Sequence, residues 1–303
     1  MSAKPHLAAR DLALILAVVA LWGFSFVAIK VGLREIPPFA LAALRFSLAA
    51  VPLVFFIKRP RMPWRFIVGY GFGIGVFQFG LLFLGMKLGM PAGLSSVVIQ
   101  LQVFFTVGLA IAFAGERLRR EDLLGAAIAT LGVALLGVYK LMAGVTSTLI
   151  GFLLVIAAAL AWAVGNVVAK RAATTYHADM FALVVWSSLV PPLPLALLSY
   201  AFEGGATAWS AIASASAWAW GSVLLLAWGA TLFGFASWAA LLHRYPTALV
   251  SPFALLIPVS GLASGAIFLG EGLAPLQVAG VALVLLGLAE NVFGAQVRGW
   301  LRR

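Results

Sequence analysis

The chain has 303 residues, of which 64% are hydrophobic and only 10% are charged. Its mean hydropathy of +1.10 is too high for a soluble globular protein, and its apolar runs repeatedly reach the roughly 20 residues that cross a bilayer as a helix. The absence of cysteine excludes structural disulfides and thiolate metal sites. Composition therefore predicts an all-α polytopic membrane protein whose main partner is the lipid bilayer.

Charged residues and Pro/Gly clusters divide the chain into ten predicted transmembrane helices. The first apolar run is long and lacks a small-residue cleavage site, so we expect a retained span there and not a signal peptide. The predicted spans are residues 11–29, 39–57, 66–86, 92–113, 121–141, 149–168, 179–200, 217–241, 247–269 and 275–294.

Basic residues are distributed unequally between the two sides of this arrangement. Fifteen of the 20 Lys and Arg residues fall at the two termini and in the loops after even-numbered spans, four belong to the alternate loops, and Arg45 lies inside the second span. Because Lys and Arg concentrate on the cytoplasmic side, both termini are predicted to be cytoplasmic. The net charge of +11 is then a topology signal, and nucleic acid is not an expected partner.

The second half of the sequence repeats the first. Pro91, Leu94, Ser96, Leu101, Phe113, Gly115-Glu116, Leu118, Gly125 and Gly132 recur 155 residues later as Pro246, Leu249, Ser251, Leu256, Phe268, Gly270-Glu271, Leu273, Gly280 and Gly287. Trp22, Val27 and Lys30 recur 140 residues later as Trp162, Val167 and Lys170. Each copy holds five spans, an odd number, so the second must enter the membrane from the opposite side. We expect two inverted five-helix repeats, residues 1–141 and 142–303, with Glu116 and Glu271 on opposite faces.

Several motifs resemble a known family. They are Leu21-Trp22-Gly23-Phe24-Ser25-Phe26 with Lys30, Pro37-Pro38-Phe39, Ala43-Leu44-Arg45-Phe46, and the helix ends Gly115-Glu116 and Gly270-Glu271. Together they resemble the EamA family of the drug/metabolite transporter superfamily over essentially the whole chain. Gly89-Met90-Pro91-Ala92-Gly93-Leu94 and Phe104-Phe105-Thr106 are most similar to its bacterial amino-acid exporters of the YddG and cysteine/O-acetylserine types. The resemblance implies a bacterial inner-membrane carrier with a central cavity for small amphipathic metabolites.

Polar residues at mid-membrane depth indicate a site independently, because polar groups in hydrocarbon usually face the bundle interior or water. In the fourth span, Ser95, Gln102 and Thr106 share one helix face. Gln100 projects about 200° from Gln102 and is expected to face elsewhere. Gln78 in the third span is either a substrate contact or a hydrogen-bonding partner of a neighbouring helix. The nearby Gly69, Gly71, Gly73 and Gly75 series has no dinucleotide-binding spacing, which favours helix packing.

Tryptophans occupy matching central positions in the first and sixth spans. Trp22 and Trp162 could each offer an aromatic wall and an N–H donor to a zwitterion, with Asn166 one turn from Trp162; the alternative is core filling. In the ninth span, Pro252 and Pro258 have no N–H to donate, so backbone carbonyls near Ser251 lack their usual helical partner. Because such carbonyls can line a cavity, we include Ser251 among the residues of the predicted transport pathway. The predicted substrate site comprises Trp22, Gln78, Ser95, Gln102, Trp162, Asn166 and Ser251, with apolar walls from residues such as Phe77 and Phe235.

No motif indicates catalysis: the three histidines lie near span ends, and no metalloprotease or P-loop pattern occurs. We expect a transporter, not an enzyme, without metal or cofactor, in which one five-helix half rocks against the other to export amino acids or related metabolites. A nucleotide-sugar or phosphate-ester carrier would need several cations in its cavity, whereas Arg45 is the only basic residue clearly within a span. A passive channel is the remaining alternative. The sequence predicts neither an oligomeric state nor a proton relay.

Overall fold

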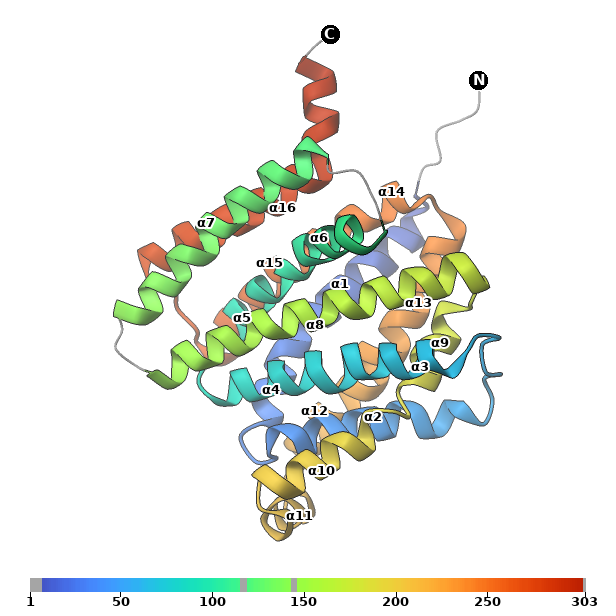
Figure 1. Cartoon of the computed structure of the whole chain (residues 1–303). Coiled ribbons are helices and arrows are strands. Elements are labelled where there is room, and N and C mark those ends of the chain that lie inside the picture. The colour runs from blue at the N-terminus through green and yellow to red at the C-terminus, as the bar shows by residue number, and fades with distance from the viewer. Residues whose placement is uncertain (1–6, 115–118, 143–145, 302–303) are drawn as a thin grey trace.

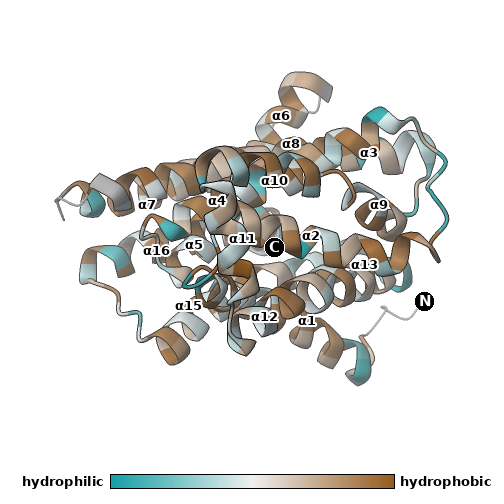
Figure 2. Ribbon diagram, turned by 90° about the horizontal axis from the view of Figure 1, so that it is seen from below, coloured by the Kyte–Doolittle hydropathy of each residue, from teal (hydrophilic) through white to brown (hydrophobic). Residues whose placement is uncertain are grey.

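The computed structural model describes residues 7–114, 119–142 and 146–301, and within them it contains helices and no strands. Nine helical segments in this part are long and apolar enough to cross a membrane, and the shorter Pro38–Val54 completes a set of ten spans. Figure 1 shows these helices running through one bundle, and Figure 2 shows hydrophobic residues along most of their length. The predicted number and order of spans are confirmed.

Many spans consist of more than one helical segment. In the first repeat they are α1 (Ala9–Gly32), α2 (Pro38–Val54), α3 (Trp64–Tyr70) with η1 (Gly71–Gln78) and α4 (Phe79–Lys87), α5 (Ala92–Val98) with η2 (Ile99–Leu101) and α6 (Gln102–Ala114), and α7 (Arg120–Met142). In the second they are α8 (Thr146–Tyr176), α9 (Met180–Ser187) with α10 (Pro192–Phe202), α12 (Ala217–Leu224) with η3 (Leu225–Phe233) and α13 (Gly234–Arg244), α14 (Thr247–Val250) with η4 (Ser251–Leu255) and α15 (Leu256–Leu269), and α16 (Pro275–Leu301).

The interruptions follow from the sequence. The seventh span breaks between α9 and α10, where Pro191 and Pro192 cannot continue a regular hydrogen-bond ladder. The third and eighth spans contain π-helical segments, η1 and η3, at matching places in the two repeats. A Cβ on Gly75 of η1 would lie 1.9 Å from Pro191 Cγ, and one on Gly73 would lie 3.2 Å from the backbone of Gly165. The glycine series therefore serves helix packing, as predicted.

The contact between the last helices of the two repeats shows their inverted relation. A Cβ on Gly125 of α7 would lie 2.6 Å from the carbonyl oxygen of Gly287 in α16, and one on Gly132 would lie 2.6 Å from that of Gly280. In the repeat, Gly125 corresponds to Gly280 and Gly132 corresponds to Gly287. The two contacts, Gly125 with Gly287 and Gly132 with Gly280, are therefore exchanged by a pseudo-two-fold axis that relates the two helices. Figure 1 shows α7 and α16 lying side by side along their length.

The two repeats interleave and are not separate bodies. Helix α1 of the first repeat packs against α12, α13 and α15 of the second, and α8 of the second packs against the third and fourth spans of the first. The chain thus forms two mixed bundles, spans one, eight and nine in one and spans three, four and six in the other. Helices of each half pack mainly against partners from the other half, and the expectation that one five-helix half rocks against the other stays a prediction.

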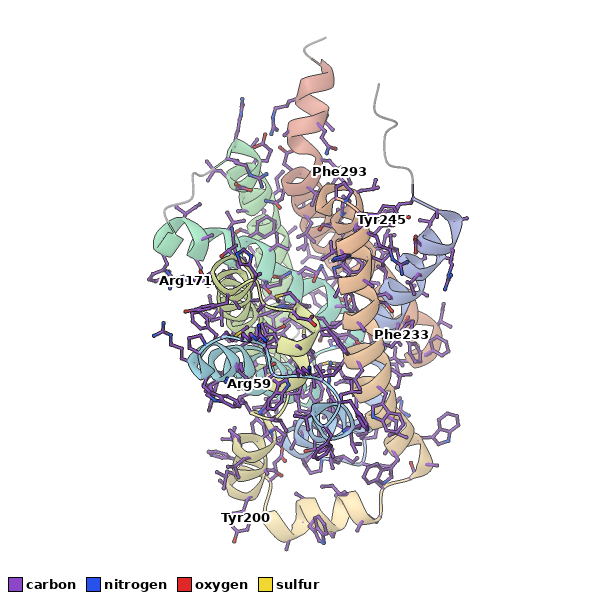
Figure 3. The ribbon with its side chains drawn as sticks, turned by 90° about the vertical axis from the view of Figure 1, so that its right-hand side faces the viewer. Arg59, Arg171, Tyr200, Phe233, Tyr245 and Phe293 are labelled. Atoms are coloured by element: carbon purple, nitrogen blue, oxygen red, sulfur yellow. The ribbon has the colours of Figure 1, made fainter. Side chains whose placement is uncertain are left out.

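The segment between the predicted seventh and eighth spans contains a short helix, α11 (Gly205–Ala213). Carboxylates fix helix ends nearby: Glu203 accepts hydrogen bonds from Phe39 and Ala40 N–H at the start of α2, and Glu35 accepts them from Ser216 before α12. The Ser216 side-chain and backbone hydrogen bonds lower the pKa of Glu35 below its usual value. Figure 3 shows Tyr200 of α10 near this end of the molecule, away from Arg59, Arg171 and Tyr245.

Candidate substrate cavity

A cavity of about 280 Å³ lies at the centre of the bundle, between the two mixed bundles. Spans one, three, four, six, eight and nine contribute to its wall, and the second span adds Arg45. The lining residues are Trp22, Ser25, Phe26, Ile29, Arg45, Tyr70, Ile74, Gln78, Phe79, Leu82, Ile99, Gln100, Gln102, Trp162, Asn166, Ala230, Phe235, Trp238, Ala254 and Ile257. A small apolar-walled cavity with a few polar groups is typical of a small-molecule site.

Aromatic rings form one wall. Trp22 packs against Phe235 and Trp238, with ring centroids 5.4 and 5.2 Å apart. The Trp22 indole N–H donates to the carbonyl oxygen of Ala230 at 2.8 Å, so it is already used in joining α1 to η3. The expectation that Trp22 offers this donor to a ligand is therefore wrong, although its ring lines the cavity. No hydrogen bond to the described residues engages the corresponding N–H of Trp162, which remains available.

Opposite spans meet in an amide cluster. Asn166 of α8 donates through Nδ2 to Gln102 Oε1 at 2.7 Å and to Thr106 Oγ1 at 3.1 Å. Thr106 in turn donates to the backbone carbonyl of Gln102 at 2.6 Å. These bonds leave Asn166 Oδ1 and Gln102 Nε2 without a partner among the described residues, so the cluster presents an acceptor and a donor.

Two further amides face the cavity without a protein partner. Gln78 and Gln100 are 2% and 4% exposed and form no hydrogen bond within the described part of the chain, where no fully inaccessible side-chain nitrogen or oxygen lacks a partner, so their amide groups are open to the cavity. Gln100 was expected to face away from the site, and this expectation is wrong. The turn Ile99–Leu101 is a 3-10 helix, in which each residue rotates by about 120° and not 100°, so Gln100 and Gln102 come about 40° closer together in projection. A buried amide without a protein partner is costly unless water or ligand binds it.

Three residues predicted for this site lie elsewhere. Ser95 is fully buried and its hydroxyl donates to the carbonyl of Pro91 one turn earlier, which satisfies it within its own helix. Ser251 is exposed at the start of η4 and is not among the lining residues, although Ala254 of the same 3-10 turn is. Phe77 is 53% exposed and lies on the outer side of η1. Trp22, Gln78, Gln102, Trp162 and Asn166 do line the cavity, and their role in binding stays a prediction.

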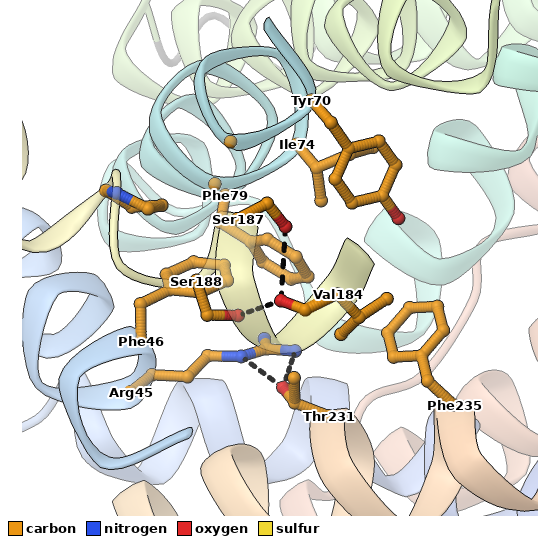
Figure 4. A pocket seen from close by; sticks show the side chains of 13 residues that line it. Arg45, Phe46, Tyr70, Ile74, Phe79, Val184, Ser187, Ser188, Thr231 and Phe235 are labelled. Carbon is orange, nitrogen blue, oxygen red and sulfur yellow. Dashed lines mark hydrogen bonds between the residues drawn. The ribbon is translucent and has the colours of Figure 1, made fainter. Parts of the chain in front are cut away.

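Arg45 was not among the predicted site residues, yet it borders the cavity. Arg45 is 3% exposed, and its Nε and one terminal nitrogen donate to Thr231 Oγ1 at 3.2 and 3.0 Å. The guanidinium carbon lies 3.8 Å from the centroid of the Phe79 ring. Figure 4 shows Arg45 and Thr231 beside a side pocket of about 20 Å³, which has room for about one water molecule. The only available sequence signal was a lone arginine inside an apolar span.

One side of the cavity is sealed. We call the side where α1 begins and α16 ends the terminal side; the seal lies on the opposite side, between α1, α5 and α15. There a Cβ on Gly261 would lie 2.2 Å from Ser96 Oγ, and one on Gly23 would lie 2.4 Å from Ser260 Oγ. Such close approach of small residues leaves no passage.

Two ionic groups hold the loops beside this seal. The Glu271 carboxylate, which follows α15, accepts hydrogen bonds from the N–H groups of Ala92 and Gly93 at 2.7 and 2.8 Å. The Lys30 ammonium of α1 donates to the carbonyls of Met86 and Met90 at 2.7 and 3.1 Å. Glu116, the repeat counterpart of Glu271, lies outside the described residues.

The terminal-side halves of the same spans diverge. Helix α6 packs mainly against α8, and η4 packs against α1, α15 and α16. Trp238, Ala254 and Ile257 line the cavity at this level. The cavity is therefore closed on one side by α5 and α15 and bounded on the other by helices that pack against other partners.

Comparison with known proteins identifies a matching family, related sequences and a similar structure. The model of the EamA-like transporter family matches residues 10–138 and 149–292. A probable amino-acid metabolite efflux pump of Salmonella typhimurium is 44% identical over 95% of this chain and 97% of its own, and one of Escherichia coli is 42% identical over the same shares. A probable terminal-alkyne amino-acid exporter of Streptantibioticus cattleyicolor is 29% identical over 91% of each chain. One crystal structure shares the fold, with a TM-score of 0.63 and 23% identity over 96% of this chain and 99% of that one.

Proposed function

Because the chain belongs to the EamA-like transporter family, we propose that it is a secondary transporter that exports amino acids or related small metabolites by alternating access. The relatives that cover almost the whole chain are named as amino-acid metabolite efflux pumps, which supports this substrate class. Those relatives are named as pumps, and for this chain too we propose transport and not catalysis.

The cavity is the observation that carries the proposal. It lies at mid-membrane between bundles of mixed origin, and its wall combines aromatic rings with amide groups that no described residue satisfies. Indole rings suit the apolar side chain of a small amphipathic metabolite, and the amides suit its polar groups. Binding at the interface of inverted repeats is the arrangement that allows a site to face each side in turn.

We propose that this structure is the state open to the cytoplasm, in a bacterial inner membrane with both termini cytoplasmic. The excess of Lys and Arg in the loops of the terminal side supports this orientation. The seal between α5 and α15 would then be the external gate, and its opening would accompany closure of α6 against the ninth span. The moving parts are the two mixed bundles and not the two sequence repeats.

A phosphate-ester or nucleotide-sugar carrier is less consistent with the cavity. Phosphate groups carry up to two negative charges and are usually held by several cations. Among the residues that line this cavity, Arg45 is the only cationic one. The single positive charge of one guanidinium can neutralise one carboxylate, but it cannot neutralise the larger negative charge of two phosphate groups.

The test is uptake of labelled amino acids by proteoliposomes that contain the purified protein, with and without a pH gradient. A carrier should show saturable uptake that unlabelled internal substrate accelerates. Strictly linear, unsaturable flux would indicate a channel, and no flux of any amino acid would contradict the proposed substrate class. The pH-gradient arm shows whether transport is proton-coupled.

A further inference from the structure

The guanidinium of Arg45 is a buried charge without a counterion in the described structure. Two of its five N–H groups donate to Thr231, and no hydrogen bond to a described residue engages the other three. Thr231 and the Phe79 ring stabilise the cation but neutralise none of its charge. A buried charge that lacks a partner is strongly unfavourable, so an anion is expected to bind there.

None of the carboxylates in the described part of the chain serves this purpose. The eight described acidic residues all have other partners: Asp11 with Arg244 and Tyr245, Glu35 with Ser216, Glu121 and Glu290 with Arg298, Asp122 with Arg119 and Asn291, Asp179 with the start of α9, Glu203 with α2, and Glu271 with α5. None of them lines the cavity. No described side chain therefore supplies the charge that would pair with Arg45.

The position of Arg45 points to the transported molecule as that source. Arg45 lines the cavity together with the unpaired amides of Gln78 and Gln100. The side pocket behind the guanidinium has room for about one water molecule only, so a larger anion has to approach from the cavity. Figure 4 shows the guanidinium bonded through Nε and one terminal nitrogen to Thr231. These bonds use two of its five N–H groups.

We propose that Arg45 binds the carboxylate of the substrate, so that the carrier selects amino acids with a free carboxylate over their amides and amines. This inference rests on the proposed function and specifies its substrate. A bidentate guanidinium–carboxylate pair neutralises the buried charge. The substrate ammonium is then held by oxygen acceptors such as Asn166 Oδ1 and by the faces of Trp22 and Trp162. A neutral amide or a cationic amine leaves Arg45 uncompensated.

The first arm of the test uses the wild-type protein in proteoliposomes. The labelled L-amino acid that enters fastest is competed with its unlabelled form, its α-carboxamide and its decarboxylated amine. A hydrogen-bonded charge pair of this kind corresponds to about a 10- to 100-fold difference, so we expect the two analogues to compete at least about 10-fold more weakly. Equal competition by the carboxamide would overturn the inference. If no amino acid enters at all, it is the proposed function that fails.

The second arm compares Arg45→Gln with Arg45→Lys and with Arg171→Gln, a basic residue outside the cavity. Arg45→Gln should reduce kcat/KM for the amino acid about 10- to 100-fold and remove the preference over the carboxamide, whereas Arg171→Gln should change neither. Arg45→Lys, which keeps the charge but not the fork of donors, should be intermediate. Loss of rate with an unchanged preference would overturn the inference. If Arg45→Gln elutes as an aggregate, the wild-type competition arm decides the question.

Discussion

The amides of the cavity differ in whether the protein itself satisfies them. Gln102 and Asn166 bond each other, so each loses part of its hydrogen-bonding capacity to the fold. Gln78 and Gln100 are more deeply buried and make no such bond with described residues. Substrate binding should therefore depend more on the unpaired amides. Removing one of them breaks no hydrogen bond of the folded protein, whereas it removes a hydrogen-bond partner of the ligand.

We predict that Gln78→Leu, which keeps the approximate volume of the side chain, raises KM about 3- to 30-fold. Its unfolding temperature should not fall, because no described protein hydrogen bond is lost. Saturable uptake and thermal unfolding in detergent measure the two effects. Ser95→Ala is the matched control: its hydroxyl bonds within its own helix outside the cavity, so transport should be unchanged. A normal KM for Gln78→Leu would remove this residue from the binding site.

The two repeat-related tryptophans should respond differently to the same change. Trp22→Phe removes the N–H that bonds Ala230 and should lower the free energy of unfolding by about 1 kcal/mol. Trp162→Phe removes an N–H without a described partner and should leave stability unchanged while raising KM. Equilibrium unfolding and uptake kinetics distinguish these outcomes. Equal destabilisation of both variants would contradict the assignment of their donors.

Depth in the membrane was enough to predict that Trp22, Trp162 and Gln102 line the cavity, because a central polar or aromatic residue seldom faces lipid. The position of Gln100 was not predictable in this way, because a regular helical projection does not include the 3-10 turn at Ile99–Leu101. The role of Arg45 was not predicted either, because its partner Thr231 and the other residues of the cavity are far from it in the sequence.

At the scale of elements, glycine spacing determines how closely helices approach. The repeat was visible as paired glycines, and their periodicity indicated packing, but which helix each would meet depends on tertiary structure. The α7–α16 contact joins Gly125 to Gly287 and Gly132 to Gly280. Figure 1 shows this pair at one edge of the molecule, where it links the ends of the two repeats.

We predict that Gly287→Ala destabilises the protein by about 1–3 kcal/mol. Its Cβ would lie 2.5 Å from the carbonyl oxygen of Gly125, a backbone atom that cannot move without separating the helices. Gly108→Ala in α6 is the control, because a Cβ there meets nothing within 4 Å. The control should be neutral or slightly stabilising, since alanine favours helix more than glycine does. Thermal unfolding of both variants checks this, and equal stability would contradict the close α7–α16 contact.

At the scale of the whole molecule, the sequence indicated two inverted repeats but not their interleaving. Periodicity and charge distribution assign each span to a repeat, whereas the partners of α1 and α8 are determined by shape in three dimensions. Interleaving changes the mechanism: the seal between α5 and α15 joins one mixed bundle to the other, so alternating access requires that this seal open.

We predict that Glu271→Gln weakens this seal. Its carboxylate joins the loop after α15 to the first N–H groups of α5, and a neutral amide offers one oxygen and no charge to the helix N-terminus. Ser96 is fully buried between these helices, and the chain has no cysteine, so a Ser96→Cys variant reports opening by maleimide labelling. Adding Glu271→Gln should accelerate labelling about 10-fold, which corresponds to a loss of about 1.4 kcal/mol. Glu203→Gln is the matched control, because Glu203 binds two consecutive N–H groups of α2 in the same way but does not join α5 to α15. If both variants accelerate labelling equally, the Glu271 contact is not part of the gate.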